Sequence, residues 1–120
     1  MQKLTRKEEE IMQVLWKLEK AFIKEILEEL PGPKPHYNTV STMIKILEEK
    51  QFIEREKFGN MYRYHPIVSK SSYQSDAADD LLEKYFDGSS VNIIAHFAKK
   101  ENMSEQEVQE IINIINASKS

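Results

Sequence analysis

The chain has 120 residues, 40% hydrophobic and 31% charged, which fits one globular domain or one small domain with an appended module. The absence of cysteine excludes disulfides and thiolate metal sites, and no apolar run approaches the roughly 20 residues of a membrane-spanning helix. No signal-peptide pattern opens the chain, so we expect a cytoplasmic protein.

The net charge of −3 is unevenly distributed along the chain. Residues 1–68 carry 12 Lys and Arg against 11 Asp and Glu, whereas residues 69–120 carry 5 against 9. The first segment can therefore present a local basic surface although the whole chain is acidic. Together with the elements predicted below, this contrast indicates an N-terminal domain over 1–68 and a helical region over 69–120.

Two helices are predicted before residue 31. Thr5 and Glu8 have the spacing of a capping box, which opens a helix over about residues 6–19. A second helix is expected near 21–30, where apolar residues recur at helical spacing. It ends at a Pro-Gly-Pro-Lys-Pro segment, because proline lacks the backbone N–H that a continuing helix needs.

A third helix is predicted over 36–51, with one apolar side and an unusual polar side. Val40, Ile44 and Leu47 have helical spacing for a buried stripe, whereas the opposite side carries short hydroxyl and amide groups that are mediocre helix formers. In a helix-turn-helix protein such groups can contact base edges in the major groove. The predicted reading residues are Asn38, Thr39, Ser41, Thr42 and Lys45, with Tyr37 as a flanking phosphate or sugar contact.

A β-hairpin is predicted over 52–67, because Gly59 and Asn60 form a two-residue turn signal between two β-rich runs. Pairing the residues that flank this turn places opposite charges across from each other, as cross-strand pairing favours. Three helices followed by this hairpin predict a winged helix-turn-helix. Its wing would supply contacts to the DNA backbone from Lys57, Asn60 and Arg63.

Each of these assignments has a simpler alternative. Ser and Thr on a helix face, and Lys and Arg on a hairpin, are mostly exposed to solvent in any globular protein. A winged-helix module can also bind a protein instead of DNA. Steep salt dependence of DNA affinity would separate a DNA-binding protein from these alternatives.

Three further helices are predicted over about 70–86, 90–100 and 105–117, so the fold class is mainly α. Such short helices cannot bury all their apolar residues on themselves, so we expect a symmetric partner and a C-terminal dimerisation region. The alternative is that they pack back on the N-terminal domain. The predicted dimerisation residues are Leu81, Leu82, Phe86, Ile94, Phe97, Ile111, Ile112 and Ile115.

No catalytic or metal-binding pattern is present in the sequence. His36, His65 and His96 are isolated from one another, and none is paired with a carboxylate at metal-ligand spacing. The serines lack a nucleophile elbow, and each glycine has a role in a turn. The sequence therefore predicts neither an enzyme, nor a bound metal, nor a cofactor.

Four segments, which together span nearly the whole chain, have a distinctive pattern: LTRKEEEIMQVLWKL, YNTVSTMIKILEEKQFI, GNMYRYHPIVS and VNIIAHFAKKENMSEQEVQEIINII. In these segments the sequence resembles the penicillinase and methicillin-resistance repressor family of bacteria. The resemblance implies a homodimeric transcriptional repressor that binds an inverted-repeat DNA operator through its N-terminal winged helix and dimerises through its C-terminal helices. The family usually has Arg at the position of Ile46 and Gly at that of Gln51.

The resemblance also implies a route by which repression is relieved. Family members are cut by a membrane-embedded sensor metalloprotease between an Asn and a Phe, and the matching bond here is His96–Phe97. Copper-responsive relatives carry a C-terminal cysteine cluster, and the lack of cysteine excludes that branch.

Overall fold

The computed structural model describes residues 2–119, apart from the side chains of residues 115, 118 and 119. It divides into two compact units, with the division between Asp76 and Ala77. This division falls inside a helix, beyond the boundary at 68/69 that composition indicated. The units are described separately below.

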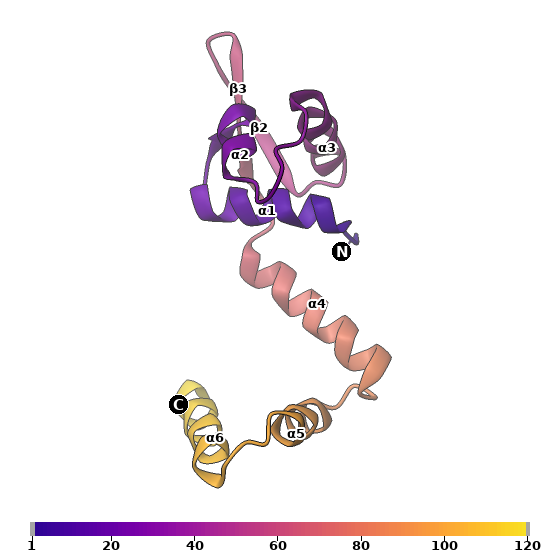
Figure 1. The fold of residues 1–120 in the computed structure, drawn as a ribbon, viewed down its shortest axis with the longest axis vertical. Coiled ribbons are helices and arrows are strands. Elements are labelled where there is room, and N and C mark those ends of the chain that lie inside the picture. The colour runs from indigo at the N-terminus through magenta and orange to yellow at the C-terminus, as the bar shows by residue number, and fades with distance from the viewer. Residues whose placement is uncertain (1, 120) are drawn as a thin grey trace. The chain divides into compact units, whose positions relative to one another are not determined.

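The N-terminal unit is a winged helix-turn-helix, as predicted (Figure 1). Three helices surround the base of a sheet, and the hairpin extends beyond them as the wing. The sheet has the antiparallel strand order β1-β3-β2. Its elements are α1 (Arg6–Leu18), β1 (Ala21–Phe22), α2 (Ile23–Glu29), α3 (Tyr37–Glu49), β2 (Ile53–Phe58) and β3 (Met61–Pro66).

The hairpin has the predicted turn and register. Phe58 pairs with Met61 across the turn, so the remaining residues of β2 and β3 pair in the predicted register. Glu54 and His65 lie opposite each other, with the Glu54 carboxylate oxygen 3.5 Å from His65 Nε2. The two-residue connection therefore sets the positions of all the wing side chains.

The predicted second helix begins later than expected, because Ala21 and Phe22 form the short strand β1. Ala21 pairs with Tyr64 and Phe22 with Arg63, which closes the sheet against β3. The Glu25 carboxylate accepts a hydrogen bond from the Phe22 N–H at 2.9 Å and so caps the start of α2. The helix prediction was wrong at these two residues because pairing with a distant strand competes with local helix periodicity.

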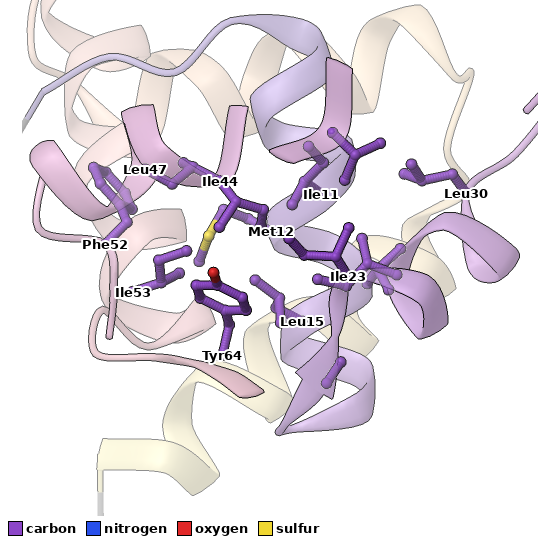
Figure 2. Packing of buried hydrophobic residues seen from close by; sticks show 14 residues of the cluster. Ile11, Met12, Leu15, Ile23, Leu30, Ile44, Leu47, Phe52, Ile53 and Tyr64 are labelled. Atoms are coloured by element: carbon purple, nitrogen blue, oxygen red, sulfur yellow. The ribbon is translucent and has the colours of Figure 1, made fainter. Parts of the chain in front are cut away.

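One hydrophobic core joins the three helices to the base of the hairpin (Figure 2). The side chains of α3 that the apolar stripe predicted, Val40, Ile44 and Leu47, are all buried in it. Tyr64 reaches this core from β3, so the base of the wing is packed against the helices and does not move as a free loop.

The end of α3 is a Schellman motif with a non-glycine residue in the left-handed region. The Phe52 N–H donates to Leu47 O and the Gln51 N–H to Glu48 O, both at 3.0 Å. Gln51 has φ of 63°, a conformation that strains any residue with a Cβ. The family that the sequence resembles usually has glycine at the position of Gln51, and a glycine would avoid this strain.

Gln51→Gly is therefore expected to raise the free energy of unfolding by up to about 1 kcal/mol. The gain comes from relief of left-handed strain, offset by the greater freedom of glycine in the unfolded chain. Urea denaturation followed by circular dichroism measures it, with Gln51→Ala as the control that keeps a Cβ. A destabilisation by Gly larger than that by Ala would contradict this interpretation.

An aromatic cluster explains why the N-terminal unit extends to Asp76. The Tyr73 ring lies 5.7 Å from that of Trp16 and 5.9 Å from that of Phe52. Its hydroxyl donates to Glu9 Oε1 at 2.7 Å; burial first, and then this hydrogen bond, raise the pKa of Tyr73 to about 12. The first turn of α4 (Lys70–Tyr85) is thus packed on the winged helix.

The C-terminal unit consists of the rest of α4 with α5 (Ser90–Lys100) and α6 (Glu105–Lys119). None of its described side chains is buried. Of the predicted dimerisation residues, Ile115 lies outside the described side chains, and the others are half-buried or exposed. The exposed ones are Leu81, Ile94, Phe97 and Ile112. Within residues 2–119, no helix is long and apolar enough to cross a membrane.

Candidate nucleic-acid interface

The polar side of α3 faces solvent because its apolar side is fixed in the core. Burial of Val40, Ile44 and Leu47 leaves no rotation of the helix that would hide the opposite face. The exposed members of the predicted reading set are Tyr37, Asn38, Thr39, Thr42 and Lys45, while Ser41 is half-buried. Ile46, at the position where the family usually has Arg, is also exposed.

One reading residue has its hydroxyl proton engaged within the helix. Thr42 Oγ1 donates to the carbonyl oxygen of Asn38, one turn earlier, at 2.9 Å. The hydroxyl of Thr42 therefore has no proton left to donate to a base, and its methyl group is the other branch at Cβ. A methyl group on an exposed helix face suits contact with the thymine methyl in the major groove.

The N-terminus of α3 offers backbone donors. His36 precedes the helix but makes no side-chain hydrogen bond to its first turn. N–H groups at the start of a helix favour an anion such as phosphate, and Tyr37 stands exposed beside them.

The C-terminal end of α3 is tied to α1 by a buried ion pair. Lys50 Nζ lies 3.1 and 3.0 Å from the two carboxylate oxygens of Glu8, which is only 3% exposed, and it also donates to Lys3 O at 3.0 Å. Burial raises the pKa of Glu8, but hydrogen bonds from Thr5 and Lys50 outweigh it and hold that pKa below its ordinary value. This pair joins the C-cap residue of α3 to the first turn of α1.

The wing presents two faces of different charge. The face toward α3 carries Arg55 and Lys57 with Tyr62 and Tyr64, because directly paired residues lie on the same side of a sheet. The other face carries Glu54, Glu56, Phe58, Met61, Arg63 and His65. The structure therefore separates Lys57 from Arg63, although the sequence had placed both in one set of DNA contacts. Asn60 is exposed in the turn.

Arg55 joins the wing to α3 and was not singled out from the sequence. Its Nε is 3.7 Å from Glu48 Oε2, and its guanidinium carbon lies 4.4 Å from the centre of the Tyr62 ring. Arg55 also pairs with Tyr64, and burial, then the charge of Glu48, raise the pKa of that tyrosine. The predicted register could have identified Arg55, because its pairing with Tyr64 places it on the same face of the hairpin as Lys57, which pairs with Tyr62.

The histidines are in unrelated environments. His36 precedes α3, His65 pairs with Glu54 in the wing, and the ring of His96 lies 5.5 Å from those of both Phe86 and Phe97. Over the part of the chain that the structure describes, no group of three or more potential ligand residues could hold a metal ion.

A winged helix-turn-helix with an exposed polar face on its second motif helix belongs to a class of DNA-binding folds. The family model of the penicillinase repressor matches residues 4–117, so the chain belongs to the penicillinase repressor family. This finding confirms the resemblance read from the sequence. The protein is accordingly a transcriptional repressor of that family and not an enzyme.

Individual relatives match over most of the chain. The methicillin resistance regulatory protein MecI of Staphylococcus aureus (strain N315) is 29% identical over 108 residues, which cover 89% of this chain and 88% of the relative. The penicillinase repressor of Bacillus licheniformis is 25% identical over 116 residues, covering 92% and 88%. A solved CopR repressor structure, 28% identical, covers 57% of this chain and 100% of that chain with a TM-score of 0.47.

Proposed function

We propose that this protein is a dimeric repressor that binds an inverted-repeat operator in double-stranded DNA. The observation that carries the proposal is the exposed polar face of α3, held beside a cationic wing face in a member of a repressor family. Asn38, Thr39, Ser41, Thr42 and Lys45 would read bases, and Tyr37, Lys57 and Asn60 would contact the backbone. The cytoplasmic location expected from the sequence is part of this proposal.

A dimer is supported by the composition of the C-terminal unit. Its described side chains include no buried residue, yet α4, α5 and α6 expose Leu81, Ile94, Phe97 and Ile112. Contact with a second copy would remove this apolar surface from water, and a two-fold axis would match an inverted repeat. The α3 helices of the two copies, which would read the bases, would then lie about 34–36 Å apart, which is one turn of DNA, or a multiple of that distance apart.

Proteolytic relief is the second part of the proposal and is supported by the place of the His96–Phe97 bond. Both residues are exposed in the middle of α5. A cut there would separate the start of α5 from α6, which carries Ile111, Ile112 and Ile115 of the predicted interface. Cleavage by a membrane-embedded sensor metalloprotease would therefore divide the dimerisation unit, and the repressor would dissociate from its operator.

The test begins with selection of bound duplexes from a random DNA library, followed by affinity at several salt concentrations. Recovery of an inverted repeat with steep salt dependence is the expected result. Absence of any duplex binding at physiological salt would refute the repressor proposal for this chain. It would favour the alternative, a winged-helix module that binds protein.

Two substitutions at Thr42 test how the operator is read. Thr42→Ser removes the methyl group and is expected to cost about 1 kcal/mol at one operator position, where the preference for thymine relaxes. Thr42→Val keeps a methyl there and should retain the preference, because the hydroxyl proton is already bonded to Asn38 O. Binding to an operator and to its single-base variants measures both.

Thr42→Ser and Thr42→Val each serve as the control for the other, and affinity for random duplex measures binding that does not depend on sequence. Neither substitution should change affinity for random duplex, since no phosphate contact is lost. Retention of the preference in Thr42→Ser together with its loss in Thr42→Val would show that the hydroxyl reads the base. Equal effects on operator and random DNA would remove Thr42 from the reading set.

A further inference from the structure

We infer that Arg55 is the arginine of the wing that contacts the DNA backbone and that Arg63 serves to stabilise the wing. The inference rests on the proposed function and assigns the wing's part in it. It replaces Arg63, which the sequence suggested as a DNA contact, with Arg55, which the sequence did not suggest, and it follows from the register, contacts and charges of the hairpin.

The pleat of the hairpin puts the two arginines on opposite faces. Arg55 pairs with Tyr64, whose side chain is buried in the core beneath the wing. Arg63 pairs with Glu56 and, on its other side, with Phe22 of β1. Since side chains of paired residues point to the same side, Arg55 lies on the face that packs toward α3, and Arg63 lies on the reverse face.

The charges of the two faces differ in sign. The face toward α3 carries the cations Arg55 and Lys57 and no carboxylate among its strand residues. The reverse face carries Glu54 and Glu56 against the single cation Arg63, so its net charge is negative and would repel a phosphate chain at close range. A polyanion that lies along the reading helix therefore meets the Arg55 face of the wing at lower electrostatic cost.

Arg55 is held in place while its terminal groups stay accessible. Its side chain is 52% exposed, and its guanidinium carbon lies 4.4 Å from the centre of the Tyr62 ring. The Glu48 carboxylate faces Nε at 3.7 Å, which leaves the two terminal amino groups of the guanidinium for a phosphate. A side chain restrained in this way loses less rotamer entropy when it binds.

Arg63 is occupied in packing. Its guanidinium carbon lies 4.1 Å from the centre of the Phe58 ring, which in turn packs edge-on against Phe22 at 6.2 Å between ring centres. Its Nε is buried without a hydrogen-bond partner. For Arg63 to reach a phosphate it would have to leave this stack and uncover more of the Phe58 ring, which is already 44% exposed, so its guanidinium serves as a partial cover for the aromatic pair.

The experiment measures affinity for the selected operator and for random duplex between about 50 and 200 mM salt, a range in which phosphate contacts dominate the change. Arg55→Ala is expected to weaken both complexes and to reduce the slope of log affinity against log salt by about 1. Arg63→Ala should leave the slope unchanged and lower the melting temperature of the free protein. Arg55→Gln, which keeps the stem but not the charge, guards against an effect of misfolding.

The outcomes separate this inference from the function on which it rests. A reduced slope in Arg63→Ala with an unchanged slope in Arg55→Ala and Arg55→Gln would overturn the assignment while leaving the repressor proposal intact. Equal salt slopes for the Arg55→Ala and Arg63→Ala variants would also overturn the assignment and leave the repressor proposal intact. A wild-type protein that binds neither duplex would overturn the inference together with the proposed function.

Discussion

Replacing both Ile94 and Ile112 with glutamate is expected to convert the proposed dimer into a monomer and to lower operator affinity roughly 10²- to 10⁴-fold. Each side chain is 42% exposed in the single chain, so the substitutions leave the fold of one copy largely undisturbed. In a dimer the same positions would place unpaired carboxylates in an apolar contact, which is strongly unfavourable. The loss of affinity follows because two unlinked winged helices bind two half-sites independently.

Light scattering and operator binding measure the two consequences. A double variant with Asn92→Glu and Asn113→Glu adds the same charge to exposed polar positions of α5 and α6, and it should remain a dimer. An unchanged mass in the Ile94/Ile112 variant would move the interface elsewhere. A monomeric wild type would contradict the dimer itself.

Glu8→Gln is expected to lower the free energy of unfolding by about 2 kcal/mol at neutral pH. It leaves the Lys50 ammonium next to a neutral amide, and loss of one partner of a buried pair costs roughly 3–5 kcal/mol in general. The cost is smaller here because the Lys50 side chain is 23% exposed. Urea denaturation of wild type and variant across a range of pH measures the difference.

The pH dependence of this difference has a definite sign. Because the folded-state pKa of Glu8 lies below its ordinary value of 4.5, the carboxylate contributes stability above pH 4.5 and loses it as the pH falls through the folded-state pKa. The gap between wild type and Glu8→Gln should therefore shrink on acidification below pH 4.5. A gap that stays constant would show that the ionised form of Glu8 is not what stabilises the fold.

Glu10→Gln is the matched control on the same helix. Glu10 is partly exposed, and its oxygen is 4.0 Å from Nε of the exposed Arg6, so this surface pair should contribute little. The control variant should keep nearly the stability of the wild type at each pH. If Glu10→Gln lowered the free energy of unfolding as much as Glu8→Gln, the effect would come from the change in net charge and not from the loss of the buried pair.

The sequence predicted those elements whose stabilising contacts are local. The capping box of Thr5 and Glu8 forms at the start of α1, and the turn at Gly59 and Asn60 sets the register of the wing. Both depend on residues within a few positions of each other. The order of these elements was sufficient to predict the winged helix-turn-helix, and the helical period was sufficient to predict the buried side of α3.

The elements that the sequence missed depend on distant contacts. Strand β1 has two residues and exists through its pairing with Tyr64 and Arg63, far along the chain. The attachment of the start of α4 to the winged helix depends on Tyr73 packing against Trp16 and Phe52. Local periodicity contains no information on either contact, so the start of α2 was misplaced and this attachment was not predicted.

The same distinction applies to the candidate DNA-binding surface. The sequence by itself determined which residues of α3 face outward, because a helix has one period and its apolar stripe must be buried. The pleat likewise determined that Arg55 and Arg63 lie on opposite faces of the wing. Only the tertiary structure decided which face meets α3, because that choice depends on Tyr64 entering the core from one side of the sheet.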